Sequence, residues 1–279
     1  MNRFLVFQSD FGLCDAAVCA MEGVSFSVSA DLNIRHLTHE ITPFNIFEAS
    51  YRLLQAITYW PEGTVFVSVV DPGVGSDRLS VVARTRNNQY IVTPNNGTLT
   101  HINQFVGVEE VRIIDETRNR LKNSELSYTF HGRDVYAYTG AKLASGTIDF
   151  EGVGPLVENE KIEMLDTYGS ILKGNLVEGQ IDILDGTFGS LWTSVTYEDF
   201  KKIGFEFGDI VDVNIYNGKK LIYTNKVTYG HSFADVQIGA PVVYMNSVNH
   251  MALAINQGNF ADAYRIGVGS PWIITFEKV

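Results

Sequence analysis

The hydrophobic positions in the first part of the chain predict strands that alternate with helices. Short apolar runs at residues 4–8 and 33–36, and a longer one at 65–70, have the continuous apolar character of buried strands. Apolar residues at helical spacing, preceded by the capping pair Asn45 and Glu48, predict a helix between the second and third strands. This alternation is typical of an α/β domain.

The alternating pattern continues to about residue 165. Apolar runs at residues 79–85 and 89–93 predict a hairpin, and a further strand is expected at 111–114. A helix is then expected to run to about residue 145 and to stop at Gly146. We therefore expect residues 1–165 to form a Rossmann-like α/β sandwich domain.

From about residue 170 the pattern changes to closely spaced strands with almost no helical signal. The strands are expected at residues 175–184, 190–196, 210–216, 219–224, 240–246 and 251–256. Asn217 and Gly218, between two alternating strands, form the strongest hairpin signal in the chain. We expect residues 166–279 to form a second, all-β domain with a barrel-like architecture.

Length and composition agree with a globular protein of two domains or of one large domain. The chain has 279 residues, of which 45% are hydrophobic and 19% are charged, as in an ordinary soluble protein. It contains no run of eighteen apolar residues, and the apolar part of its start is too short for a signal peptide. We therefore expect a cytoplasmic location and no membrane partner.

Charge and cysteine content exclude several classes of function. The net charge of −11 and the lack of a basic run argue against a nucleic-acid partner and favour a small-molecule enzyme. A cationic ligand would be a natural match for paired carboxylates. Cys14 and Cys19 lie in one segment, and no Cys/His pair has zinc-like spacing, so we expect buried free thiols and no metal site.

The loop after the third strand carries a carboxylate at a position where ligands collect. Asp71 follows the strand directly, and Pro72 and Gly73 force an irregular loop. In open α/β sheets, ligands bind at the carboxyl ends of the strands. Arg78 follows closely enough to turn back toward Asp71. The alternative is a structural turn in which Asp71 accepts hydrogen bonds from backbone amides and Arg78 is solvated.

Three further positions are candidates for chemistry. Asp10 and Asp15 lie where the first strand leads into the first helix, and a carboxylate there could accept two hydrogen bonds from a vicinal diol. Alternatively, both are acids at a helix N-terminus, favoured by the helix dipole. His131, beside Gly132 at a helix start, is a candidate proton carrier or a structural hydrogen-bond donor.

Four segments carry a more specific signal: SDFGLCD at 9–15, VVDPGVGSDR at 69–78, TFHGRDV at 129–135 and MNSVNHMALAINQGN at 245–259. In order and spacing they resemble the S-adenosyl-L-methionine (SAM) hydrolases that form adenosine, also called SAM hydroxide adenosyltransferases. These enzymes are relatives of the fluorinating and chlorinating SAM enzymes. The resemblance covers nearly the whole chain, including the change from α/β to all-β.

The resemblance implies a fold, an assembly and a reaction. It implies a homotrimer in which each site lies between one subunit's N-terminal domain and a neighbour's C-terminal domain. Water or hydroxide would attack the 5′ carbon of SAM, giving adenosine and L-methionine without a metal or a cofactor. By motif match the catalytic residues are Asp71, Arg78 and His131. Halogenating relatives carry other residues at the Asp and His positions, so this set favours water over halide.

The resemblance also implies substrate-binding roles. Asp10 corresponds to the residue that grips the ribose diol, Asp15 to the one that meets the methionine ammonium, and Phe44 to an aromatic position along the ligand. The other implied substrate-binding residues are Phe130, Gly132, Asp185, Phe188, Ser190, Phe233, Tyr244, Ser247 and Val248.

Two of these positions depart from the family pattern. Ser190 stands where the family usually has Asn, and Val248 where some relatives carry a polar or basic residue. A hydroxyl offers fewer hydrogen bonds than an amide, so adenine recognition would be weaker or mediated by water. Two alternatives therefore stay open beside hydrolysis: a SAM-dependent halogenase, and a non-catalytic protein that binds SAM or adenosine.

Overall fold

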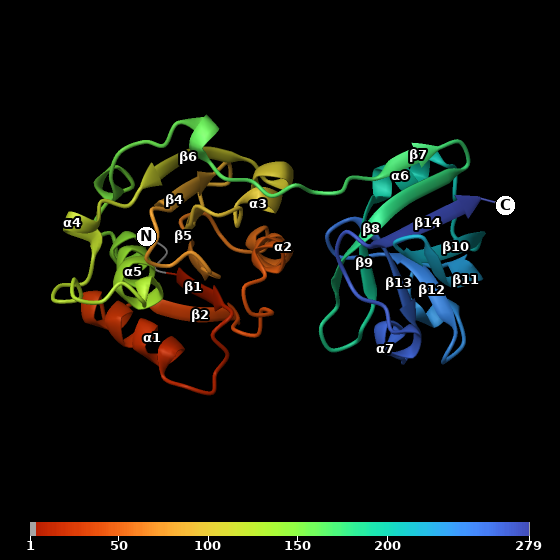
Figure 1. Ribbon diagram of the computed structural model, residues 1–279, viewed down its shortest axis with the longest axis horizontal. Coiled ribbons are helices and arrows are strands. Elements are labelled where there is room, and N and C mark those ends of the chain that lie inside the picture. Colours follow the sequence, from red (N-terminus) through yellow and green to blue (C-terminus); the bar gives the residue numbers. More distant parts are fainter. Residues whose placement is uncertain (1–3, 279) are drawn as a thin grey trace. The chain divides into compact units, whose positions relative to one another are not determined.

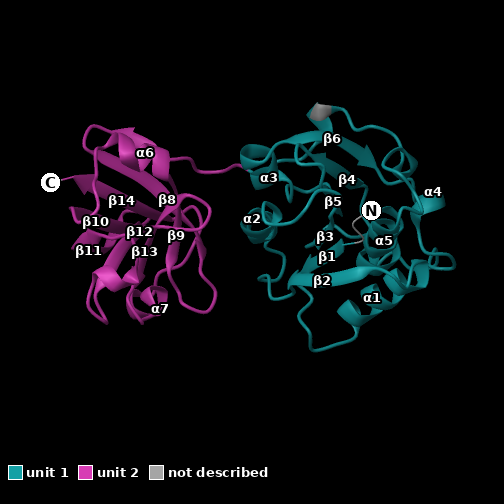
Figure 2. Cartoon of the chain, turned by 180° about the vertical axis from the view of Figure 1, so that it is seen from behind, with its two compact units in different colours: residues 1–165 teal, residues 166–279 magenta. Residues whose placement is uncertain are grey.

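The computed structural model describes residues 4–278. The chain divides into two compact units, residues 1–165 and residues 166–279 (Figure 2). Each unit has its own hydrophobic core and is described by itself below. Within residues 4–278, no helix is both long enough and apolar enough to cross a membrane.

The first unit is built on a six-stranded sheet with the order β2-β1-β3-β5-β4-β6. Its strands are β1 (Phe4–Ser9), β2 (Asn33–Thr38), β3 (Val65–Val69), β4 (Ser80–Thr85), β5 (Tyr90–Pro94) and β6 (Val108–Ile113). Strands β2, β1, β3 and β5 are parallel, whereas β4 runs antiparallel to both of its neighbours. The predicted strands and the hairpin of β4 and β5 are confirmed.

Helices cover both faces of this sheet (Figure 1). Helices α1 (Ala17–Val28) and α5 (Tyr138–Ser145) pack on one face, and α2 (Ile46–Ile57) and α3 (Thr100–Phe105) on the other. Short helical pieces complete the unit: α4 (Glu116–Asn119), η2 (Glu151–Val153) and η3 (Asn159–Lys161). This three-layer arrangement confirms the predicted α/β sandwich.

The predicted helix before Gly146 has an unexpected first half. It begins as a π-helix, η1 (Gly132–Ala137), and continues as α5. Gly146 ends it in the left-handed conformation with a φ of 75°, as the pattern predicted. The apolar spacing did not reveal the π segment, which begins directly after His131.

The second unit is a closed β-barrel. The sheet order is β14-β10-β11-β12-β13-β9-β8-β7, and an additional pairing of β14 with β8 closes it. Its strands are β7 (Ile171–Lys173), β8 (Leu176–Leu184), β9 (Leu191–Thr196), β10 (Ile210–Asn217), β11 (Lys220–Tyr229), β12 (Pro241–Met245), β13 (His250–Ile255) and β14 (Trp272–Lys278). The helical pieces are α6 (Tyr197–Lys202), η4 (Phe233–Asp235) and α7 (Phe260–Tyr264).

The barrel confirms the predicted architecture and adds elements that the pattern did not reveal. The predicted hairpin turn is present between β10 and β11, where Gly218 has a φ of 58°. Strand β11 runs five residues past the predicted end, to Tyr229, and β7, β14 and α7 were not predicted. Strand β14 pairs with both β8 and β10, so without it the barrel would not close.

Candidate functional site

A pocket of about 240 Å³ opens at the carboxyl ends of β1 and β3 in the first unit. We call it the N-terminal pocket. Its lining residues are Asp10, Phe11, Pro43, Phe44, Val69, Asp71, Val74, Thr129, Phe130, His131 and Gly132. The end of β3 and the loops after β1, β2 and β3 supply most of this lining, as expected for a ligand site in an open α/β sheet, and the start of η1 with the segment before it supplies residues 129–132.

Asp71 and Arg78 form a bidentate ion pair at this pocket. The Arg78 Nε atom donates to Asp71 Oδ1 over 2.7 Å, and its Nη2 atom donates to Asp71 Oδ2. Both side chains are largely buried, with exposed fractions of 11% for arginine and 6% for aspartate. The alternative in which Arg78 is solvated is wrong. Paired N–H donors on a carboxylate fix its orientation as well as its charge environment.

The loop between β3 and β4 is shaped so that Arg78 can reach back. Gly75 has a φ of 80°, a conformation that L side chains rarely adopt. A second anchor holds the guanidinium, because Arg78 Nη1 donates to Ser80 Oγ over 3.0 Å. Ser80 Oγ lies 3.2 Å from the hydroxyl of Tyr136, which itself donates weakly to Asp71 Oδ2 over 3.4 Å.

His131 lies between two arginine side chains. Its Nδ1 atom is 3.1 Å from Arg78 Nη2, and its Nε2 atom is 3.5 Å from Arg120 Nη1. Burial is the main cause that lowers the pKa of His131, the two guanidinium groups add to it, and Glu116 and Asp71 oppose it. A guanidinium only donates, so Nδ1 must be the unprotonated nitrogen that accepts from Arg78. His131 is therefore a neutral imidazole at pH 7.

Arg120 is itself fixed by many partners. Its Nη1 atom donates to Glu116 Oε2 over 2.7 Å, and its Nη2 atom donates to the carbonyl of Ser127 over 2.8 Å. Its guanidinium carbon lies 4.7 Å from the centre of the Tyr128 ring, close enough for a cation–π contact. Arg120, Glu116 and Tyr136 could not be predicted as site residues from the sequence, because no local pattern shows that these side chains lie close to His131 and Asp71.

The other N-terminal candidates divide into those that line the pocket and one that does not. Asp10 lines it, and its Oδ2 atom accepts from the backbone N–H of Phe44 over 2.8 Å. Phe44 also lines it, with a φ of 67° and a side chain that is 70% exposed. Phe130 and Gly132 complete the set. Asp15 instead accepts from the backbone N–H of Ala17, at the start of α1.

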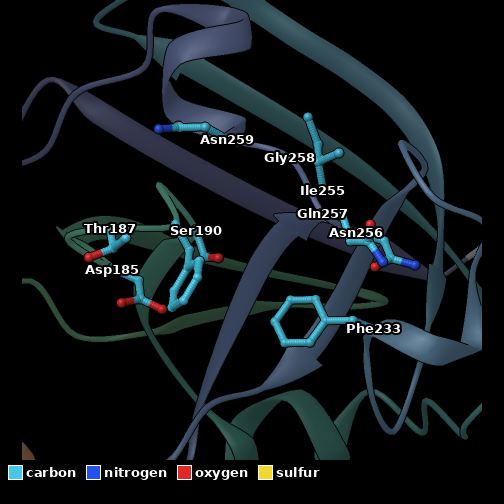
Figure 3. A pocket seen from close by; sticks show the side chains of 10 residues that line it. Asp185, Thr187, Ser190, Phe233, Ile255, Asn256, Gln257, Gly258 and Asn259 are labelled. Carbon is cyan, nitrogen blue, oxygen red and sulfur yellow. The ribbon is translucent and has the colours of Figure 1, made fainter.

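A larger pocket, of about 730 Å³, lies in the second unit (Figure 3). We call it the C-terminal pocket. Its lining residues are Asp185, Thr187, Phe188, Ser190, Phe233, Ile255, Asn256, Gln257, Gly258 and Asn259. They come from the turn between β8 and β9, from η4, and from the end of β13 and the segment after it. The last of these falls within the segment 245–259 that had been singled out in the sequence.

A tight turn presents the first of these side chains. The carbonyl of Asp185 accepts from the N–H groups of Phe188 and Gly189, over 3.1 and 2.7 Å. Gly189 has a φ of 62°, and a Cβ there would lie 1.8 Å from Asn259 Oδ1, so only glycine fits. The turn leaves the Phe188 ring 65% exposed at the pocket.

The remaining C-terminal candidates, Tyr244, Ser247 and Val248, do not line the pocket. The Tyr244 ring is buried and packs against Phe233 with 4.9 Å between ring centres. Burial raises the pKa of Tyr244, and hydrogen bonds with Ser190 and Trp192 oppose that shift. Ser247 and Val248 lie in the turn between β12 and β13, just before His250 and therefore at the opposite end of β13 from the pocket, whose β13 lining begins at Ile255.

The structure corrects the prediction for the two cysteines, and it shows whether possible metal ligands come together among the described residues. Cys14 and Cys19 are free, but both are exposed, so the prediction of buried thiols was wrong. Cys14 precedes α1, and Cys19 lies in its first turn. Among residues 4–278, no three or more His, Cys, Asp or Glu side chains come together as a metal-binding group would require.

Comparison with protein families gives two consecutive matches. A family model described as the SAM hydroxide adenosyltransferase N-terminal domain matches residues 5–154, and one described as the C-terminal domain of the same family matches residues 179–273. A crystal structure of an uncharacterized conserved protein from Thermotoga maritima is similar, with a TM-score of 0.89 and 32% identity. It covers 98% of this chain and 100% of that one.

Named relatives fall into two groups. The chain is 37% identical to the (R)-S-adenosyl-L-methionine hydrolase of Methanocaldococcus jannaschii, over 60% of this chain and 65% of that protein. It is 31% identical to the protein of the same name from Thermus thermophilus, over 96% of this chain and 98% of that protein. It is 28% identical to a fluorinase of Actinoplanes sp., over 98% of each chain.

Proposed function

Because this chain belongs to the SAM hydroxide adenosyltransferase family, we propose that it hydrolyses SAM to adenosine and L-methionine. Water would attack the ribose 5′ carbon and break its bond to the sulfonium sulfur. The observation that carries this proposal is the set of Asp71, Arg78 and His131 at one pocket, together with the ligand-facing carboxylate of Asp10.

The chemistry requires little beyond positioning and a proton acceptor. The sulfonium sulfur leaves as a neutral thioether, so no general acid is needed. The attacking water forms the new C–O bond and must lose one proton, which balances the positive charge of the substrate. Holding that water in line with the breaking bond supplies much of the rate enhancement. Strong cation stabilisation at sulfur would favour the ground state and slow the step.

Within this proposal the Asp71 carboxylate accepts the proton from the attacking water, and Arg78 orients that carboxylate. The ion pair holds the carboxylate in place, and Oδ1, which accepts from Arg78 Nε, keeps a second lone pair for the water, whereas Oδ2 also accepts from Tyr136. His131 orients Arg78 and does not act as the base, since guanidinium groups face both of its nitrogens. The contacts of His131 with both arginine side chains support the role of orienter over that of base, a choice that the sequence leaves open.

Substrate binding is assigned by the same proposal. Asp10 would hold the ribose diol, with Phe44, Phe130 and Gly132 along the ligand and Asp15 toward the methionine ammonium. In the second unit the proposed contacts to the adenine and methionine ends are Asp185, Phe188, Ser190, Phe233, Tyr244, Ser247 and Val248. No metal or cofactor is part of this proposal, since SAM itself is the substrate.

We also propose a homotrimer whose sites lie at subunit interfaces. In support, three of the aromatic side chains that line the two pockets are exposed: Phe44 by 70% at the N-terminal pocket, and Phe188 by 65% and Phe233 by 42% at the C-terminal pocket. Large exposed apolar groups at a pocket are typical of surfaces that another chain covers. Sedimentation should then give three times the chain mass of 31.0 kDa. A cytoplasmic location remains a prediction, which cell fractionation would check.

The proposal is tested by incubating the purified protein with SAM in chloride-free buffer and separating the products. Adenosine and methionine should appear in equal amounts. Asp71→Asn, which keeps the shape but removes the charge, should lower turnover by at least about a hundredfold. Asp77→Asn is the matched control, because Asp77 is an exposed acid of the same loop that does not line the pocket.

Two other outcomes would overturn hydrolysis in favour of the alternatives. A 5′-halogenated nucleoside that forms only when halide is added would indicate a halogenase, as the fluorinase relatives are named. Saturable SAM binding without any product would indicate a binding protein, which the departures at Ser190 and Val248 first suggested.

A further inference from the structure

A chain of four hydrogen-bonding side chains leads from the surface of the first unit to the buried residue next to Asp10. Glu22 Oε1 lies 2.8 Å from His36 Nε2, His36 Nδ1 lies 2.7 Å from His39 Nε2, and His39 Nδ1 lies 2.7 Å from Ser9 Oγ. We call this chain the relay. It starts at half-buried side chains and ends at Ser9 and His39, which are 0% and 4% exposed.

The relay joins parts of the fold that are distant in sequence. Glu22 lies on α1, His36 on β2, His39 in the loop after β2, and Ser9 at the end of β1. Ser9 immediately precedes Asp10, which lines the N-terminal pocket. None of the proposed steps of SAM hydrolysis uses the relay.

When both imidazoles are neutral, each hydrogen bond of the relay has one possible donor and one possible acceptor. A carboxylate only accepts, so His36 carries a proton on Nε2 toward Glu22, and a neutral His36 ring then accepts at Nδ1. His39 must then donate from Nε2 and accept at Nδ1 from the hydroxyl of Ser9. Ser9 Oγ in turn accepts from the backbone N–H of Phe11 over 3.3 Å. Every donor has one acceptor when both imidazoles are neutral.

The end of the relay fixes the backbone that directly follows Asp10. Ser9 Oγ accepts from the N–H of Phe11, and the carbonyl of His39 accepts from the N–H of Gly12 over 2.8 Å. The Asp10 carboxylate itself accepts from the N–H of Phe44. The direction of the Asp10 side chain therefore depends on a segment that Ser9 and His39 hold in place.

We propose that His36 and His39 are positioning residues for Asp10, acting through the relay from Glu22 to Ser9. A Ser–His–Glu series could also suggest a nucleophilic serine. The fully buried Ser9 does not line the N-terminal pocket, so no substrate carbonyl reaches it. The relay instead orders the segment that presents the proposed diol-binding carboxylate, and its effect on SAM rests on the proposed function.

His36 offers a matched pair of variants at a half-exposed position. His36→Asn keeps an acceptor oxygen close to the place of Nδ1, whereas His36→Phe keeps the ring and removes the acceptor. His36→Phe should raise KM for SAM about fivefold, the effect of losing one buried hydrogen bond, with kcat within about twofold of the wild type. His36→Asn should restore KM. Glu40→Gln, an exposed acid next to His39, is the control and should change neither constant.

A second readout does not depend on SAM. Nitrogen NMR of labelled histidine should find His36 and His39 both protonated on Nε2 at pH 7, and His39 should lose this preference in His36→Phe. The proposal is overturned if either wild-type ring carries its proton on Nδ1, or if His36→Phe leaves both KM and the His39 tautomer unchanged. If the wild type fails to turn over SAM, the proposed function fails, and the tautomers still decide the relay.

Discussion

At the scale of single residues, Arg120 and Glu116 change the pKa of His131 in opposite directions. Arg120 Nη1 lies 3.5 Å from His131 Nε2 and is paired with Glu116, while Arg78 faces the other ring nitrogen. The guanidinium group of Arg120 lowers the pKa of His131 and the carboxylate of Glu116 raises it. Replacing each charged side chain in turn by a neutral one can therefore separate the effect of Arg120 on the pKa of His131 from that of Glu116.

We expect Arg120→Gln to raise the pKa of His131 and Glu116→Gln to lower it further, because each change removes one of the opposing charges. Proton NMR titration of the His131 ring measures both shifts. The pKa of His39, which depends on burial and on His36, serves as an internal reference and should stay in place. Shifts of the same sign in both variants would contradict this account of His131.

His39 should make stability depend on pH. Burial, followed by the proximity of His36, lowers the pKa of His39 from 6.5 to about 4. Between these values the unfolded chain binds a proton that the native protein does not, so the free energy of unfolding rises with pH in this range. A difference of two to three pKa units corresponds to about 3 kcal/mol.

Urea unfolding at a series of pH values measures this effect. The wild type should lose about 3 kcal/mol of its free energy of unfolding from His39 alone as the pH falls from 6.5 to 4. His39→Asn should show a correspondingly flatter profile over that range. If both proteins lose stability in parallel, His39 titrates normally in the native state and its burial has no energetic effect.

The sequence predicted the site residues that lie at strand ends or in family motifs, but not those that reach the site through tertiary contacts. Asp10, Asp71 and His131 follow strands or begin a helix, so strand-end logic and the family motifs both point to them, and all three line one pocket. Arg120 and Tyr136 reach the site through tertiary contacts that leave no mark on spacing. The proposed roles of all these side chains stay predictions until variants are measured.

At the scale of elements, Gly140 allows α5 to pack closely on the sheet. A Cβ at Gly140 would lie 2.5 Å from Val67 Cγ2 and 3.3 Å from Leu5 Cδ1. Val67 belongs to β3, the strand that leads to Asp71. In contrast, a Cβ at Gly23, inside α1, would meet no atom within 4 Å.

These two helical glycines should respond in opposite ways to the same change. Gly140→Ala should lower the free energy of unfolding by about 1–3 kcal/mol, because the added methyl overpacks the contact with Val67. Gly23→Ala should raise it by about 0.5–1 kcal/mol, because alanine loses less conformational entropy in a helix. Denaturant unfolding measures both, and a stabilising Gly140→Ala would show that α5 does not approach β3 this closely.

Elements with strong local signals were predicted and the others were not. Strands β1 and β3 have continuous apolar runs, and Asn45 caps α2 by accepting from the N–H of Glu48, as their spacing predicted. The π-helix that follows His131 was missed, because its wider turns do not change which residues are apolar. Strand β14 was missed because its pairing partners are far away in sequence.

At the scale of the whole molecule, the change of pattern near residue 165 predicted two kinds of architecture. The first unit is an α/β sandwich and the second is a closed barrel. Local periodicity could indicate an all-β unit, but closure depends on the pairing of β14 with β8, which only the folded chain reveals. Local patterns carry no information on assembly, so the homotrimer rests on family resemblance and on exposed aromatic side chains.

The most direct test of the central claim is to run the SAM reaction in water labelled with heavy oxygen and to analyse both products by mass spectrometry. Attack of water on the 5′ carbon, with Asp71 as the proton acceptor, should place one labelled oxygen in the 5′ hydroxyl of adenosine and none in methionine. Unlabelled adenosine, or label in the amino-acid product, would contradict the account, because the nucleophile or the carbon attacked would then be different.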